Sequence, residues 1–188
     1  MDVAFFLMSA GLLFTPGPTN TLLAVGGATS GLRRSWLLPP AELAGYFLAI
    51  HLLAFAVGPL VQAPSVQLLS RLGLALYLIW LAAQLWRSHA ALLPHQTVTP
   101  ARVFTVTLLN PKALVFAFVV LPPLAQGWSA ALPSLAALAA MIVSASLCWI
   151  ALGAAIARGR IMDTGWITRA GGGVLALFAI LLALSALR

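Results

Sequence analysis

The chain has 188 residues, of which 62% are apolar and 7% are charged, and its formal net charge is +7. A soluble domain has about 45–50% apolar and about a quarter charged residues, so this composition excludes an ordinary soluble globule and a disordered tail. The single cysteine, Cys148, excludes an internal disulfide and a paired-thiol redox centre. The mean hydropathy of +1.06 indicates that lipid is the main solvent.

A membrane-spanning helix needs about 20 predominantly apolar residues, because the hydrocarbon core is about 30 Å thick. Six stretches meet this length, which predicts an all-α integral membrane protein with one transporter domain, residues 1–188. In chain order they cover residues 3–28, 36–60, 66–86, 103–125, 132–157 and 167–187. The first is interrupted at Thr15-Pro16-Gly17-Pro18 and the fourth at Asn110-Pro111-Lys112.

The basic residues between these stretches predict the orientation of the chain. The loops after the second and fourth stretches carry no Lys or Arg, whereas those after the first, third and fifth carry seven arginines. They are Arg33, Arg34, Arg87, Arg102, Arg158, Arg160 and Arg169. The positive-inside rule therefore places the odd-numbered loops in the cytoplasm and both termini outside. The basic charge is explained by topology, so we expect no nucleic-acid partner.

An internal repeat divides the chain. Pro16 and Pro111 are 95 positions apart, and Arg71-Leu72-Gly73 matches Arg169-Ala170-Gly171 at a similar offset. We expect two three-helix halves, residues 1–94 and 95–188. Because three is odd, the second half enters the membrane from the opposite side, which is the inverted repeat of many secondary transporters. Broken helices at matching positions of the two halves indicate a binding site in such folds.

The two interruptions supply the candidate residues for substrate binding and translocation. These are Thr15, Pro16, Gly17, Pro18, Asn20, Asn110, Pro111 and Lys112. Prolines remove backbone donors, and the groups that they free cannot face lipid. We expect Thr19 and Asn20 to cap the outgoing half-helix, whose N-terminal end favours a carboxylate. The alternative is a packing kink that neighbouring helices satisfy.

Two charges lie within the predicted spans and are not explained by topology. Lys112 is about 13 Å deep and Glu42 about 9 Å deep, so an ion pair between them is feasible. A buried lysine needs a partner or water, which suits a substrate carboxylate; the alternative is a side chain that reaches the headgroups. Glu42 either neutralises Lys112 or takes up a proton or a substrate amine. His51 is a further candidate for proton coupling, with hydrogen-bonded packing as its alternative.

The motifs of other functional classes are missing from the sequence. There is no glycine-rich phosphate loop followed by Lys-Ser/Thr, no carboxylate pair and no metal-ligand spacing. We therefore expect no enzyme, no cofactor and no metal. The alternative functions are an exporter of metal ions or other small solutes on the same fold, and a non-transporting membrane scaffold. Small residues at Ala41, Gly45 and Gly171-Gly172-Gly173 suit close helix approach.

The motifs resemble those of the LysE/RhtB family of amino-acid exporters. The resemblance rests on Thr15-Pro16-Gly17-Pro18, Gly31 before a basic turn, and Asn110-Pro111-Lys112-Ala113. It implies proton-driven export of a zwitterionic amino acid or derivative across the bacterial inner membrane, and it leaves a homodimer open. The chain departs from the family pattern at Pro18-Thr19-Asn20 and at Pro39-Pro40-Ala41-Glu42, so it does not imply a particular substrate.

Overall fold

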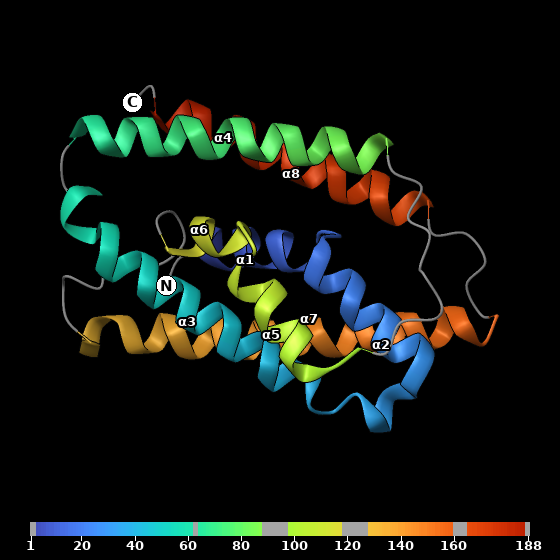
Figure 1. Cartoon of the computed structure of the whole chain (residues 1–188). Coiled ribbons are helices and arrows are strands. Elements are labelled where there is room, and N and C mark those ends of the chain that lie inside the picture. Colours follow the sequence, from blue (N-terminus) through green and yellow to red (C-terminus); the bar gives the residue numbers. More distant parts are fainter. Residues whose placement is uncertain (1–2, 62–63, 88–97, 118–127, 160–164, 187–188) are drawn as a thin grey trace.

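The computed structural model describes residues 3–61, 64–87, 98–117, 128–159 and 165–186, and these ranges contain helices and no strand (Figure 1). The helices are α1 Val3–Phe14, α2 Pro18–Arg34, α3 Leu38–Val61, α4 Pro64–Arg87, α5 Pro100–Leu108, α6 Lys112–Val115, α7 Trp128–Ala157 and α8 Gly165–Ala186. The prediction of an all-α protein is confirmed for these residues. Both predicted breaks are present, between α1 and α2 and between α5 and α6.

Two helical segments in the described ranges, Leu38–Ala56 and Ser129–Ala157, are long and apolar enough to cross a membrane. Shorter apolar segments lie at Phe5–Phe14 and Gly172–Leu181. The first and fourth predicted spans do not pass this test as single helices, because each is broken into shorter pieces. Residues 118–125 of the fourth span lie outside the described residues. Six spans therefore stay a prediction.

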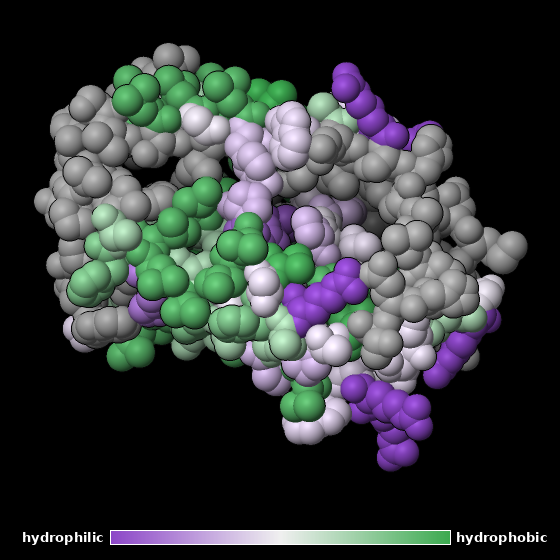
Figure 2. Space-filling view, viewed as in Figure 1, coloured by the Kyte–Doolittle hydropathy of each residue, from purple (hydrophilic) through white to green (hydrophobic). Residues whose placement is uncertain are grey.

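The chain reverses direction repeatedly along the long axis of the molecule (Figure 1). Helices α2, α4 and α7 end at one end of the molecule, whereas α1 begins and α8 ends toward the other. The exposed arginines Arg33, Arg34, Arg87 and Arg158 terminate or follow α2, α4 and α7. Among the residues that Figure 2 colours, hydrophilic side chains gather toward that end and apolar side chains gather toward the opposite end.

Each broken helix packs against a helix from the other half of the chain. Helix α2 packs on α7 and α5 packs on α3, while α4 packs on α8. At the crossing of α2 and α7, a Cβ atom on Gly27 would overlap the backbone of Ile150, and one on Gly153 would overlap that of Ala24. At the crossing of α3 and α5, a Cβ atom on Gly45 would lie 2.8 Å from Thr107 Cβ. The suggestion of close approach at Gly45 is confirmed.

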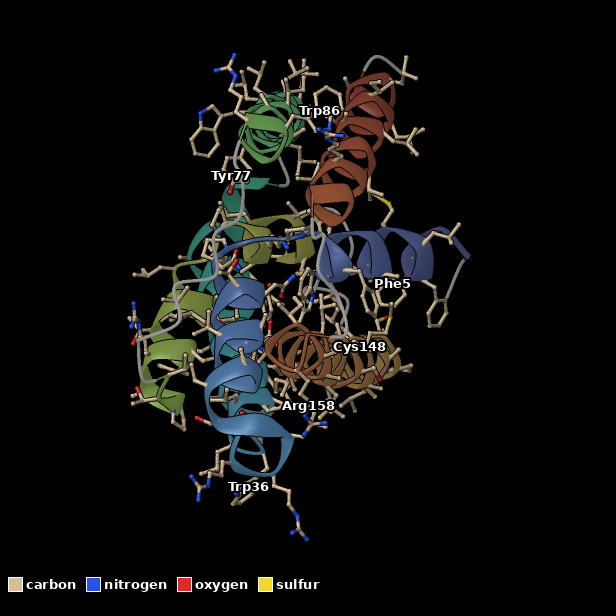
Figure 3. The ribbon with its side chains drawn as sticks, turned by 90° about the vertical axis from the view of Figure 1, so that its right-hand side faces the viewer. Phe5, Trp36, Tyr77, Trp86, Cys148 and Arg158 are labelled. Atoms are coloured by element: carbon tan, nitrogen blue, oxygen red, sulfur yellow. The ribbon has the colours of Figure 1, made fainter. Side chains whose placement is uncertain are left out.

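Helices α4 and α8 form a pair that lies beside the remaining helices (Figure 3). Trp86 near the end of α4 donates from Nε1 to the carbonyl of Arg169 at 3.1 Å. Its indole lies against Gly172, where a Cβ atom would come within 2.6 Å of Nε1. Gly172 thus admits the indole ring, because a side chain at that position would overlap it.

Candidate functional site

The first break follows from two prolines around an extended glycine. Thr15 still donates its backbone N–H to the carbonyl of Gly11 at 3.1 Å, so the α-helical hydrogen bonds of α1 continue up to that residue. Gly17 then adopts φ −174° and ψ 177°, and α2 begins at Pro18. Pro18 has no N–H for the carbonyl of Phe14, and the extended Gly17 cannot serve Leu13. The break therefore releases main-chain carbonyls within the core of the molecule.

Side-chain donors bind two of the carbonyls at the break, those of Leu13 and Thr15. Asn20 Nδ2 donates to the carbonyls of Leu13 and Thr15, both at 2.7 Å, and Trp149 Nε1 donates to Leu13 at 3.2 Å. The prediction that Thr19 and Asn20 cap α2 is wrong, because no side chain caps its first turn. The amide of Asn20 donates backward instead, to carbonyls at the end of α1, because buried carbonyls without a donor are costly.

The second break is nearly helical. Leu109 and Asn110 donate their backbone N–H groups to Thr105 and Thr107 at 3.1 and 3.0 Å, and Pro111 has α-helical angles of −65° and −12°. Asn110 Oδ1 accepts from the backbone N–H of Lys112 at 3.0 Å. The backbone groups of this break are hydrogen-bonded within the break itself. The side-chain amide of Asn110 and the ammonium of Lys112 therefore remain available to other helices.

The structure brings the two breaks together, as the predicted site requires. Lys112 Nζ donates to the carbonyl of Thr15 at 2.6 Å, and Asn110 Nδ2 donates to Thr19 Oγ1 at 3.0 Å. Gly17 lies against the ammonium, since a Cβ atom on it would sit 3.2 Å from Nζ. Lys112 is only 2% exposed. The other predicted members are Pro16, which is buried, Pro111, which is half-buried, and Pro18, which is exposed.

The electrostatics of the first break are unbalanced. The C-terminal end of α1 carries partial negative charge, and it receives the ammonium of Lys112. The N-terminal end of α2 carries partial positive charge and free first-turn N–H groups, and no side chain caps it. Among the described residues, this positive end has no anionic partner. Two positive features, the ammonium and the start of α2, therefore lie side by side at Gly17.

Glu42 is buried on α3 and is not in an ion pair with Lys112. Its Oε2 accepts a hydrogen bond from the hydroxyl of Ser146 on α7, which also lies 2.7 Å from the carbonyl of Ile142. The charges of Glu42 and Lys112 are close enough to interact, but no contact within 4.0 Å joins them. Lys112 is held by the break in α1–α2 and Glu42 by α7, so the suggested ion pair does not form.

His51 lies apart from the breaks. It follows Glu42 by nine residues on α3, about 13 Å along the helix axis. Its Nδ1 lies 2.6 Å from the carbonyl of Phe47, and because a carbonyl only accepts, that nitrogen carries the hydrogen. The imidazole ring of His51 and the phenyl ring of Phe47 stack with centroids 5.9 Å apart. These contacts match the packing alternative of the sequence analysis and leave proton coupling through His51 a prediction.

Several residues of the site were not predicted. Tyr46 follows Glu42 by one turn, and its hydroxyl lies 3.4 Å from Asn110 Nδ2, so helical spacing offered a signal for it. Thr107 precedes the second break by one turn and donates to Thr19 at 3.3 Å. Ser146 and Trp149 had no such signal, because their partners are distant in sequence and only the packing of α7 brings them near.

The described residues contain no group of three or more His, Cys, Asp or Glu that could hold a metal ion. A family model described as LysE type translocator matches residues 10–188, nearly the whole chain. No curated protein and no solved structure matches the chain.

Proposed function

The chain belongs to the LysE type translocator family, and from this premise we propose that it exports an amino acid or a small amino-acid derivative across the bacterial inner membrane. Membership makes the chain a multi-pass membrane transporter of a solute. The proposal adds the substrate class, the membrane and coupling to the proton gradient.

The substrate class is inferred from two positive groups that lie beside Gly17, with no anionic group between them among the described residues. They are the ammonium of Lys112 and the N-terminal end of α2. The buried ammonium of Lys112 donates to one acceptor among the described residues, the carbonyl of Thr15, although it has three N–H groups. The uncapped start of α2 lies beside it. A carboxylate at this position would accept from the ammonium and from the first-turn amides together, which is the usual way a half-helix binds an anion.

Glu42 supports a zwitterion over a simple carboxylate. It is the one acid among the described residues and its charge interacts with that of Lys112, yet the two do not form an ion pair. Each is therefore able to meet the opposite end of an amino acid, with the substrate carboxylate toward Lys112 and its ammonium toward Glu42 and Ser146. Burial makes such charge pairing favourable because an unpaired charge in a low-dielectric site is costly.

We further propose an inverted repeat in which the two halves move against each other. The exchange of partners supports it: the broken helix of each half packs on the second helix of the other half, α2 on α7 and α5 on α3. The alternating chain direction and the arginines at one end support six spans with both termini outside (Figure 1). The breaks then lie at the interface between the halves, where alternating access exposes a fixed site.

The proposal is tested with the purified protein in liposomes loaded with labelled amino acids. We expect efflux of at least one zwitterionic amino acid, faster when the outside is acidic, since an exchanged proton then moves down its gradient. Lys112→Met should lower efflux at least tenfold, whereas Ser144→Ala, on the exposed face of α7, should leave it unchanged. Absence of efflux for every amino acid, or normal efflux by Lys112→Met, contradicts the proposal.

Glu42 is the proposed proton site, and Glu42→Gln separates this role from structural neutralisation. The glutamine retains an acceptor for Ser146 but cannot exchange a proton. We expect it to lose the acceleration by an acidic outside while it still exchanges labelled for unlabelled substrate. Normal dependence on the pH gradient in Glu42→Gln contradicts proton coupling through this residue. The control variant Ser144→Ala, on the exposed face of α7, is expected to retain it.

A further inference from the structure

We propose that the ammonium of Lys112 takes the place of an inorganic coupling cation, so that the chain exports its substrate without Na⁺. The inference deepens the proposed function at the same site. In broken-helix transporters, unwound carbonyls and half-helix C-terminal ends commonly coordinate Na⁺ or a proton. Here a carbonyl at the C-terminal end of α1, that of Thr15, receives a cation that the chain itself supplies.

The hydrogen bonds at the end of α1 support this assignment. The carbonyl of Leu13 accepts from Asn20 and Trp149, and the carbonyl of Thr15 accepts from Asn20 and Lys112. The carbonyls of Leu13 and Thr15 thus have two donors each, which fills their lone pairs. No acceptor is left at these two carbonyls for an inorganic cation.

The position of the ammonium supports a bridging role. Nζ contacts a carbonyl at the negative end of α1 and lies beside Gly17, the residue that precedes α2. A small cation bound there would join the backbone of the break to the substrate carboxylate. The ammonium has the same charge and keeps N–H groups for that carboxylate. Because Lys112 is covalently attached, this positive charge stays with the protein and is not transported.

Gly17 is the residue that admits the ammonium. Its φ of −174° is accessible to any residue, so backbone conformation does not require glycine at this position. A Cβ atom would approach Nζ to 3.2 Å and Cε to 3.3 Å, closer than ordinary van der Waals contact. The absence of a side chain therefore provides the space in which the tethered cation meets the break.

The experiment compares wild type, Lys112→Ala and Lys112→Met in media with Na⁺ or with choline. Wild-type efflux should agree within twofold in the two media. In choline, the efflux rate of both variants should be at least tenfold lower than that of the wild type. Added n-propylammonium has the three carbons and the nitrogen that Lys112→Ala removes, and it should raise efflux by that variant at least fivefold. Lys112→Met should not respond, because the methionine side chain fills the space.

A second readout needs no transport. At least one of the two cations, n-propylammonium or Na⁺, should raise the melting temperature of Lys112→Ala. Neither cation should raise the melting temperature of Lys112→Met or of the wild type. Strict dependence of wild-type efflux on Na⁺ overturns the inference without any variant. So does a melting temperature of Lys112→Ala that ignores both cations, or an equal response of Lys112→Met. If wild type exports no amino acid, the proposed function fails, and the melting readout still decides whether a cation site exists.

Discussion

The two helix breaks differ in how their backbone groups are hydrogen-bonded. The break between α1 and α2 is open: Gly17 is extended, α2 is uncapped, and the released carbonyls depend on side chains from elsewhere. The break between α5 and α6 is closed by its own hydrogen bonds and stays close to helical geometry. The first break needs donors and the second provides them, through Asn110 and Lys112. Two similar proline motifs thus form one candidate site with distinct chemical halves.

The two helix crossings beside the breaks should differ in how well they tolerate alanine in place of glycine. At the crossing of α2 and α7, a Cβ atom on Gly27 would lie 2.0 Å from the carbonyl oxygen of Ile150, whereas one on Gly45 would lie 2.8 Å from Thr107 Cβ and 2.9 Å from the carbonyl oxygen of Phe104, a smaller overlap. We expect Gly27→Ala to lower the free energy of unfolding by about 3 kcal/mol or more and Gly45→Ala by about 1–2 kcal/mol. Thermal melting followed by tryptophan fluorescence checks the order, and an equal effect of the two substitutions would remove this part of the contrast.

The asparagines of the two breaks should respond differently to replacement by aspartate. The acceptors of Asn20 are carbonyls, which cannot become donors, whereas those of Asn110 are the hydroxyls of Thr19 and Tyr46, which can rotate and donate. Asn20→Asp should therefore destabilise by about 3 kcal/mol, and Asn110→Asp by about 1 kcal/mol or less. Melting temperatures in detergent distinguish them, with Ser144→Ala as the neutral control. A more damaging Asn110→Asp refutes the distinction.

The open break should retain its shape after loss of one of its several donors. Trp149→Phe removes the indole N–H but leaves Asn20 bound to the carbonyl of Leu13. We expect a loss of about 1 kcal/mol, the usual net value of one hydrogen bond, with efflux lowered less than threefold. A loss as large as that of Asn20→Asp would show that Trp149, rather than Asn20, maintains the break.

The smallest effects are expected at the residues that shape each turn. Pro111 has angles that alanine adopts freely, so Pro111→Ala should change the free energy of unfolding by less than about 1 kcal/mol. Gly17→Ala should be similarly mild in stability, because the flexible end of Lys112 yields. Its KM for efflux should nevertheless rise at least threefold as the ammonium is displaced. Equal KM values for the two variants would argue against a role for Gly17 in placing Lys112.

Much of the candidate site followed from the sequence because its signals are local. Paired prolines around Gly17 and the Asn110-Pro111-Lys112 motif break helices wherever they occur, and a lysine in an apolar run needs a partner in any fold. The role of Asn20 was mistaken, because capping is the common use of an asparagine near a helix start and the competing carbonyls became visible only with the break in place. Ser146 and Trp149 lie in an apolar stretch whose pattern does not mark them.

The sequence alone determined the helical class, the two breaks and the membrane environment, since hydropathy and proline chemistry act on neighbouring residues. Only the tertiary structure decided which partners the freed groups take. Lys112 binds the carbonyl of Thr15 rather than Glu42, and Glu42 accepts from Ser146 instead. Helix crossings at Gly27, Gly153 and Gly45 fix those distances, because they let backbones approach where any side chain would separate them. Hydrogen bonds across about 100 positions depend on that packing, and no local pattern encodes it.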